Sequence, residues 1–246
     1  MSLGTKKIAR ESLVKHTVAD RLRNEIATGT LRPGTRIVEG TWSRRYAVAQ
    51  GSIREAINIL AQEGFVTKAS GRSARVVNLS EQDVLEIFQV RGVLEGLAAR
   101  LVAQRKLDVK PLEEALNQMR QALRDNDAES MLDGDLRFHL ELCQLAGNPY
   151  LFEHARKIIL PLFAFARITV LSTGQSAAVW GKDLDSHQRI IDLVREGPGE
   201  LAEQYVHRAV DRFGNDAYQS WEKKSSATVN SRPKRSRGKS DNAAQS

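Results

Sequence analysis

The chain has 246 residues, a net charge of +7 at pH 7 and an apolar content of 41%, which suits one large or two small globular domains with buried cores. No apolar stretch reaches the length of a membrane span, and residues 1–12 lack the apolar segment of a signal peptide. Cys143 is the only cysteine, which excludes an intrachain disulfide and fits a reducing cytoplasm.

The charge is distributed unevenly along the chain. Residues 1–79 carry a net charge of +8, residues 80–222 carry −7 and residues 223–246 carry +6. A basic head on an acidic body predicts that the head contacts a polyanion such as nucleic acid and that the body does not. The simpler alternative is a bias of surface composition without a bound partner.

The chain begins with a polar segment, residues 1–10, that is predicted to be disordered. A helix is predicted from Ser12 to Ala27, because its apolar residues recur near one face. Leu31-Arg32-Pro33-Gly34 has the composition of a turn, since proline fixes φ and glycine accepts a positive φ. Residues 36–38 can form a short strand.

Residues 41–64 have the pattern of a helix-turn-helix. A short helix over Thr41–Arg45 and a tight link over Tyr46–Gln50 precede a second helix over Ser52–Gln62. Ser52 and Glu55 have the spacing of a capping box at the start of this second helix. In such a motif the N-terminus of the second helix meets base edges in the major groove. The alternative is an ordinary helical hairpin within a core.

Two short strands, at residues 64–68 and 74–79, flank a glycine-containing loop and predict a β-hairpin directly after the second helix. Arg72 in this loop, with Lys68 and Arg75 beside it, suits contact with phosphate or with the minor groove. Residues 11–79 are therefore expected to form a winged helix-turn-helix domain.

Residues 14–79 resemble the winged helix-turn-helix of the GntR superfamily of bacterial transcription regulators. The resemblance is carried by Val18, Leu22, Ile26, Gly29, Leu31-Arg32-Pro33-Gly34, Glu39, Val48, Ser52-Ile53-Arg54-Glu55-Ala56-Ile57, Leu60 and Glu63-Gly64-Phe65-Val66. It implies binding to double-stranded DNA. The predicted DNA-binding residues are Arg44, Arg45, Gln50, Gly51, Ser52, Arg54 and Arg72.

The sequence departs from the family pattern where bases are read. The family commonly has Ser-Arg or Thr-Arg at the position of Ala49-Gln50, and that arginine contacts operator DNA. Gln50 can still bind adenine, because an amide offers the donor and the acceptor that adenine N7 and N6 require. Arg54 matches the family's second DNA-contacting arginine, and the alternative is that it pairs with neighbouring Glu55 or Asn58. The operator is therefore expected to differ from the commonest family sequence.

Residues 80–222 have an almost entirely helical pattern, so the expected fold class is mainly α. Ser80 is predicted to cap the first helix, with acidic residues in the first turn. Pro161 is predicted to kink a long helix. The predicted helices cover residues 80–104, 112–123, 128–145, 149–172, 177–196 and 200–221.

This second region resembles, over about residues 82–218, the FCD ligand-binding domain that marks the FadR-like branch of the superfamily. The resemblance is carried by Arg91 with Leu94-Glu95, the segment from Asp135 to His139, Ala146-Gly147-Asn148-Pro149 and the segment from His187 to Val194. It implies an antiparallel all-α bundle with a central cavity, a homodimer, and a small carboxylate effector such as an organic or sugar acid.

Asp135 and His139 lie four residues apart on a predicted helix, so their side chains point the same way and can bind a divalent metal together with a further imidazole. The resemblance supplies His187 as that ligand, and zinc, manganese and nickel are the candidate ions. The family's third histidine is replaced by Ala209, and His207, two residues earlier, should face away. The alternatives are an Asp135 that pairs with an arginine, a structural core His139 and a surface His187.

Arg91 and Arg167 are the candidate ligands for an anionic effector, because a buried guanidinium needs a partner. Each can instead belong to a structural ion pair. The basic tail, residues 223–246, lacks an apolar face and is predicted to be disordered. It either adds non-specific affinity for DNA or serves only as a solubilising end.

Together these features predict a cytoplasmic bacterial regulator at the nucleoid, with repression favoured over activation and no enzymatic activity. A homodimer would bind an inverted-repeat operator, and an effector in the helical domain would change the spacing of the two heads. Two alternatives are a metal-dependent hydrolase built on Asp135, His139 and His187, and an effector-free DNA-binding protein.

Overall fold

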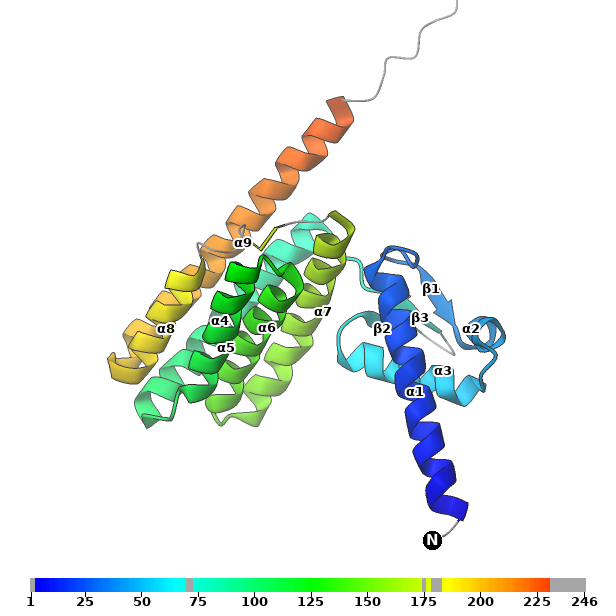
Figure 1. Cartoon of the computed structure of the whole chain (residues 1–246). Coiled ribbons are helices and arrows are strands. Elements are labelled where there is room, and N and C mark those ends of the chain that lie inside the picture. The colour runs from blue at the N-terminus through cyan, green and yellow to red at the C-terminus, as the bar shows by residue number, and fades with distance from the viewer. Residues whose placement is uncertain (1–2, 70–72, 174–175, 178–182, 231–246) are drawn as a thin grey trace, which may run out of the picture.

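The computed structural model describes residues 3–69, 73–173, 176–177 and 183–230, which form a winged-helix head and a helical body (Figure 1). The head contains α1 (Leu3–Ala27), β1 (Arg36–Val38), α2 (Glu39–Tyr46), α3 (Gln50–Gln62), β2 (Val66–Ala69) and β3 (Ser73–Val76). The body contains α4 (Glu81–Arg105), α5 (Lys110–Asp125), α6 (Ala128–Leu145), α7 (Pro149–Thr173), α8 (Leu184–Glu196) and α9 (Gly199–Asn230). The predicted fold class, mainly α with a small β-hairpin, is confirmed.

The head is organised around the contact between α1 and α3, which pack together beside an antiparallel sheet of order β1-β3-β2. The predicted hairpin is present, with Lys68 opposite Ala74. Leu22, Ile53 and Leu60 are fully buried in the core of the head. Each such side chain stabilises the fold by roughly 1.5–3 kcal/mol through removal of apolar surface from water.

The second helix of the motif, α3, begins earlier than predicted. α3 starts at Gln50 and follows Ala49, whose side chain makes no capping hydrogen bond, so Ser52 is not the N-cap. α2 likewise extends beyond the predicted Thr41–Arg45. Its last residue is Tyr46, and the C-cap Ala47 has a left-handed conformation (φ 54°). Only a short link remains before α3. The helices therefore fill almost the whole motif.

The two terminal helices extend further than the sequence suggested. α1 begins at Leu3, inside the segment of residues 1–10 that was expected to be disordered, and α9 continues past residue 222 to Asn230. Neither helix contains a proline, so the backbone hydrogen bonds can continue from the packed part outwards. The rest of the predicted disordered tail, residues 231–246, lies outside the described residues.

The body is built around α4, which contacts α6, α7, α8 and α9. The predicted cap of α4 is confirmed as a full capping box between Ser80 and Asp83. Asn148 caps α7 by accepting hydrogen bonds from the backbone N–H groups of Tyr150 and Leu151. α8 begins at Leu184 and not near Ala177, and residues 178–182 between them lie outside the described range.

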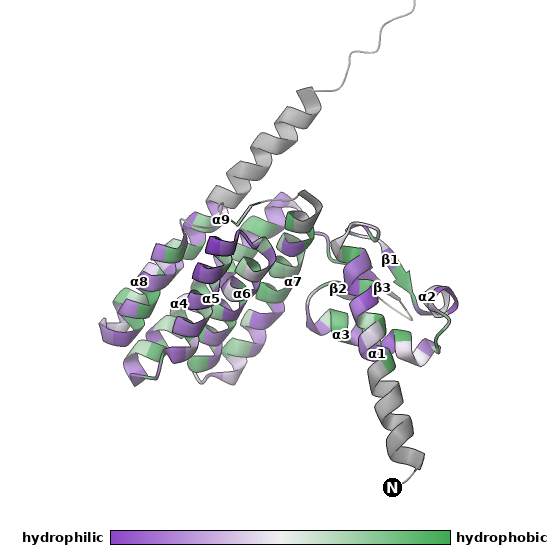
Figure 2. Cartoon of the chain, in the orientation of Figure 1, coloured by the Kyte–Doolittle hydropathy of each residue, from purple (hydrophilic) through white to green (hydrophobic). Residues whose placement is uncertain are grey.

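Hydrophobic and hydrophilic residues alternate around the helices of the body, as expected of amphipathic helices that share one core (Figure 2). Phe138 of α6, Ile159 of α7 and Val206 of α9 are all fully buried in that core. No described helix combines the length and the apolar composition needed to cross a membrane.

Helix α7 belongs to both cores and lies between the bundle and the head (Figure 1). Leu162 and Phe163 are buried in the core of the body, whereas Phe165 and Ile168 are buried in the core of the head. The backbone of Gly64 meets the same helix, because a Cβ at Gly64 would lie 2.5 Å from the Leu160 carbonyl carbon. The head therefore packs directly against helix α7 of the body.

Replacement of Gly64 by alanine is expected to destabilise the protein for two reasons. The left-handed backbone (φ +80°) costs a non-glycine residue about 1–2 kcal/mol, and the new Cβ collides with α7. Gly29→Ala is the matched control, because Gly29 has φ +76° and no neighbour within 4 Å. Urea unfolding should show a larger loss for Gly64→Ala than for Gly29→Ala. Equal losses would contradict the close approach.

Candidate DNA-binding and effector sites

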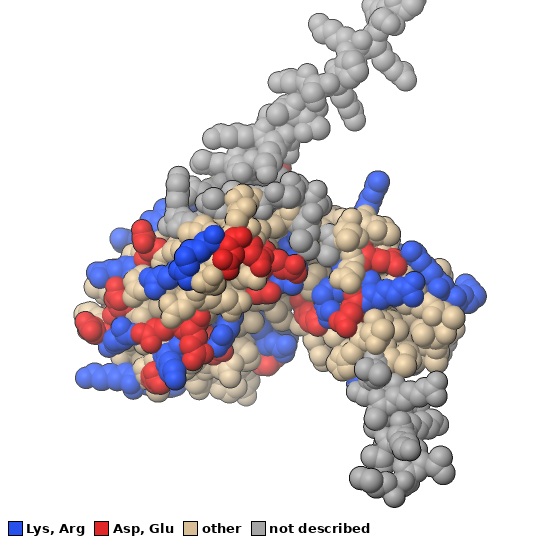
Figure 3. Space-filling model, viewed as in Figure 1, with Lys and Arg blue, Asp and Glu red and all other residues tan. Residues whose placement is uncertain are grey.

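The predicted DNA-binding side chains gather around the N-terminus of α3. Gln50, Gly51 and Arg54 are exposed there, and Arg44 of α2 is also exposed. Arg45 is exposed too, but it pairs with Glu25 of α1 at 3.1 Å and lies over the ring of Trp42. Ser52 is partly buried, and Arg72 of the predicted wing loop lies outside the described residues. Basic side chains are prominent on the part of the head farthest from the body (Figure 3). This surface suits a polyanion, in line with the charge distribution.

Arg54 is paired, but not with the neighbours considered from the sequence. Its Nε donates to Oε1 of Glu39 at 3.0 Å and its Nη2 donates to Oε2 at 2.8 Å. Asn58 instead donates to Glu55. Glu39 is almost fully buried, whereas the side chain of Arg54 is 48% exposed. The exposed guanidinium of Arg54 is therefore held in place by the buried carboxylate of Glu39.

In the body, Asp135 and His139 of α6 and His187 of α8 converge as a compact polar group. Their nearest ligand atoms lie within 4.8 Å of one another. Oδ1 of Asp135 is 3.2 Å from Nε2 of His139 and 3.0 Å from Nε2 of His187. Both imidazoles are buried, and Phe138 packs edge-on against His187. The structure thus brings together all three residues that the sequence proposed as metal ligands.

The Nδ1 atom of each imidazole, which lies on the side of the ring away from Asp135, has a hydrogen-bond acceptor beside it. Nδ1 of His139 lies 2.5 Å from Oε2 of Glu95, and Nδ1 of His187 lies 2.7 Å from the carbonyl oxygen of Asp183. An ionised carboxylate and a carbonyl can only accept, so both Nδ1 atoms carry the proton. In a neutral ring Nε2 is then a bare lone pair. Both bare nitrogens face the carboxylate of Asp135, so the group requires a cation.

That cation can be a proton or a metal ion. Burial opposes the ionised form of Asp135, but the contacts of its carboxylate with His139 and His187 hold the pKa of Asp135 far below its usual range. Burial also acts to lower the pKa of His139, yet Glu95 and Asp135 outweigh it and raise that pKa to about 9. Without a metal, His139 therefore carries the positive charge at neutral pH. The donor set of one carboxylate and two imidazoles also fits a divalent ion, because metal-binding histidines commonly donate their second N–H to such acceptors.

Arg91 joins the same network through Glu95. Its Nε donates to Oε1 of Glu95 at 2.7 Å, and its guanidinium lies over the rings of Phe88 and Phe163. The side chain is 3% exposed, and within the described residues no second hydrogen-bond partner of Arg91 is found. Despite its burial, Glu95 has a pKa lowered to about 2 by Arg91 and His139.

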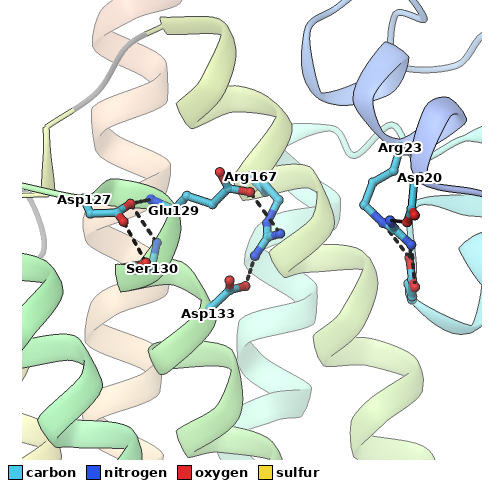
Figure 4. A network of polar contacts seen from close by, with 8 residues as sticks. Asp20, Arg23, Asp127, Glu129, Ser130, Asp133 and Arg167 are labelled. Atoms are coloured by element: carbon cyan, nitrogen blue, oxygen red, sulfur yellow. Dashed lines mark hydrogen bonds and ion pairs between the residues drawn. The ribbon is translucent and has the colours of Figure 1, made fainter. Parts of the chain in front are cut away.

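Arg167, the other candidate for an effector ligand, has different partners. It lies between Glu129 and Asp133 and forms ion pairs with both (Figure 4). None of the ion pairs or hydrogen bonds found for Arg167 in the described part of the chain involves the Asp135 group. Arg167 therefore belongs to structural ion pairs, which was the alternative to effector binding that the sequence left open.

The position of the family's third histidine contributes no ligand. Ala209 has no donor atom, and His207 pairs with Asp211 on α9 with 46% of its side chain exposed. Within the described residues, His207 does not belong to the Asp135, His139 and His187 group. The group therefore has three candidate ligands in the described part of the chain.

Sequence reasoning missed the roles of Glu39 and Glu95. Both entered only as members of the family resemblance, because their partners Arg54 and His139 lie 15 and 44 residues away along the chain. The i,i+4 spacing of Arg91 and Glu95 could have indicated their own ion pair, but not the contacts of Glu39 with Arg54 or of Glu95 with His139.

Comparison with known families identifies the class of protein that this fold and these sites define. The family described as bacterial regulatory proteins, gntR family, matches residues 14–76, and the FCD domain matches residues 86–212. The chain belongs to the GntR family of bacterial transcription regulators and carries a C-terminal FCD domain. It is therefore a sequence-specific DNA-binding regulator.

Named relatives point the same way. The chain is 26% identical over 211 residues to the gluconate operon transcriptional repressor of Bacillus subtilis, covering 83% of this chain and 85% of that protein. It is 28% identical over 182 residues to the repressor GlaR of Escherichia coli, covering 70% and 81%. The fold matches a GntR regulator from Rhodococcus (TM-score 0.63, 24% identity, 82% and 96% covered) and Escherichia coli McbR (TM-score 0.64, 18% identity, 85% and 98% covered).

The raised pKa of His139 makes stability depend on pH in protein treated with a chelator. The ordinary pKa is about 6.5 and the folded-state pKa is about 9, so the contribution is full below the ordinary value and is lost as the pH rises through the folded one. Urea unfolding should show a falling free energy of unfolding between these two pH values. His139→Gln should lose this dependence and His154→Gln, on the surface, should keep it. A flat wild-type profile would contradict the buried imidazolium.

Proposed function

We propose that this chain is a cytoplasmic, homodimeric repressor that binds an inverted-repeat operator and is released or retained by a small carboxylate. The effector binds in the helical body beside a divalent metal. The regulator role is supported by the two family matches. The metal is supported by the two imidazole Nε2 atoms that face Asp135 at 3.2 and 3.0 Å, because such a donor set suits a cation.

A divalent ion would be held by Asp135, His139 and His187. With three protein ligands it would offer an open coordination position to a carboxylate oxygen of the effector. Zinc, manganese and nickel are the candidates, since imidazole suits zinc and nickel and carboxylate suits manganese. Ala209 in place of the family's third histidine leaves that position to the effector or to water.

Arg91 is the proposed second anchor of the effector. A guanidinium can hold two partners at once, and Nε is already bonded to Glu95, so its terminal amino groups can bind a second carboxylate. Phe163 contacts both Arg91 and His139 and links the anchor to the Asp135 group. Arg167 is the second candidate, but its ion pairs with Glu129 and Asp133 favour Arg91.

Operator binding is tested by selecting duplexes from a random pool and measuring their affinity by fluorescence anisotropy at one fixed salt concentration. We expect an inverted repeat that binds at least ~10³-fold more tightly than a random duplex, as specific regulators do. Equal affinity for both duplexes would contradict the proposal and would favour an effector-free DNA-packaging protein, whose binding is driven by salt alone.

The effector response is tested by adding sugar acids and organic acids to the same complex. Gluconate comes first, because one relative is named for the gluconate operon. An active acid should lose at least about tenfold in apparent affinity on Arg91→Gln, because a charge-assisted hydrogen bond is removed. Arg167→Gln should leave the response nearly unchanged. The reverse pattern would move the effector site to Arg167.

Metal binding is tested by elemental analysis of protein loaded with zinc, manganese or nickel and then freed of excess ion. The wild type should retain about one ion per chain. His139→Ala and His187→Ala should lose it, and His207→Ala, on α9 but outside the group, should retain it. Absence of a bound ion from the wild type with all three metals would leave a proton as the cation of the site.

The homodimer is proposed to form through an exposed apolar stripe on α4. Val90, Val93 and Leu97 are 46%, 59% and 37% exposed and recur at helical spacing on one face. Leu201 of the neighbouring α9 is also exposed. Large apolar side chains that gather on a surface commonly mark a protein–protein contact.

Val93→Glu is expected to place a charge in that contact and to convert the dimer to a monomer, because an unpaired charge is costly to bury. Light scattering coupled to gel filtration measures the mass. Tyr150→Glu is the control, since Tyr150 is 80% exposed on α7 and lies outside the stripe. A dimeric Val93→Glu protein would show that the two copies meet elsewhere.

A further inference from the structure

The start of α2 is in contact with the base-reading end of α3. Glu39 is the first residue of α2 and its carboxylate accepts both hydrogen bonds from Arg54, as described above. The next residue, Gly40, has no side chain, and a Cβ there would lie 3.4 Å from Nε2 of Gln50. Glu39 thus bonds to Arg54, and Gly40 lies near the Gln50 amide.

The pairing leaves one edge of the Arg54 guanidinium available. A guanidinium has five N–H donors arranged in a planar fork. Glu39 takes one donor from Nε and one from Nη2, which form a single edge of the fork. Nη1 and the second N–H of Nη2 form the other edge, and within the described residues Nη1 has no hydrogen-bond partner. That edge matches the O6 and N7 acceptors of guanine.

The buried carboxylate also fixes the direction of the long arginine side chain. Arginine loses considerable rotamer freedom when it binds, and a side chain already held in place loses less. Glu39 cannot turn to solvent, because it is only 5% exposed and lies in the first turn of α2. Arg54 is therefore presented to DNA in a single preferred direction, and Glu39 itself stays below the surface.

Gln50 and Arg54 lie one helical turn apart on the same face of α3. Four residues of helix rise about 6 Å, which is less than two base-pair steps of about 3.4 Å each. The two side chains can therefore reach base pairs that are at most two steps apart.

We propose that Glu39 is a positioning residue that aims Arg54 at a guanine, and that this carboxylate sets operator specificity without touching DNA. The inference rests on the proposed operator binding. It predicts a half-site with a guanine read by Arg54 and an adenine, read by Gln50, within two base pairs of it.

The test is a coupling experiment between Glu39 and the guanine N7. Wild type and Glu39→Gln are titrated with the selected operator, with the same operator carrying 7-deazaguanine at the half-site guanine, and with a random duplex. In the wild type, loss of N7 should reduce affinity about 5- to 150-fold, the range for one bidentate base contact. Glu39→Gln should bind the intact operator that much more weakly and lose little more on the 7-deaza substitution. Its affinity for random DNA should stay within about twofold of wild type, because Arg54 keeps its charge.

Glu63→Gln is the matched control. Glu63 forms the same bidentate pair with Arg23, elsewhere in the head. It should leave the 7-deaza effect intact. Arg54→Ala is the second variant. It removes the guanidinium that is proposed to contact the guanine, so the 7-deaza substitution should have little further effect on its affinity for the operator.

Three outcomes would overturn the inference. Glu39→Gln could keep the full 7-deaza effect, it could weaken operator and random DNA equally with a lowered melting temperature, or Arg54→Ala could keep the full effect. A wild type without preference for the operator would instead refute the proposed operator binding, so the two failures are distinguishable.

Discussion

Glu95 is the residue on which the interior of the body depends. Its carboxylate is fully buried and accepts hydrogen bonds from Arg91 and His139, so it joins α4 to α6. Removal of one member of a buried charge pair typically costs about 3–5 kcal/mol, because the other charge is left uncompensated. By fixing the proton of His139 on Nδ1, the same carboxylate also leaves Nε2 facing Asp135. One buried charge therefore both stabilises the bundle and prepares a cation site.

A signal from the proposed effector site would have a short physical route to the head. Phe163 of α7 contacts both His139 and Arg91, and the following residues of the same helix, Ala164 and Phe165, are buried in the core of the head. A small displacement of α7 on effector binding would therefore be felt at the contact with Gly64. Effector binding changes DNA affinity only to the extent that the effector prefers one arrangement of the heads over the other.

Spacing within one helix was sufficient to predict several features, because helical geometry fixes which side chains share a face. The orientation of Asp135 with His139 and the cap at Ser80 are examples. The carboxylates Glu39 and Glu95 could not be assigned a role, because tertiary packing brings their partners to them. The capping-box pattern at Ser52 was misleading, since the short link after Ala47 starts the recognition helix at Gln50. Local sequence preference therefore predicts which helices and strands form. Tertiary packing decides where they begin and end and which buried charges pair.

The protonation of the two Nε2 atoms that face Asp135 can be observed directly by long-range proton–nitrogen NMR of the histidine rings in zinc-loaded protein. We predict that His139 and His187 carry their proton on Nδ1 and that both Nε2 atoms are unprotonated, because Glu95 and the Asp183 carbonyl accept from the Nδ1 atoms. A proton on Nε2 of either ring would contradict this arrangement. That nitrogen would then donate to Asp135 and could not bind a metal.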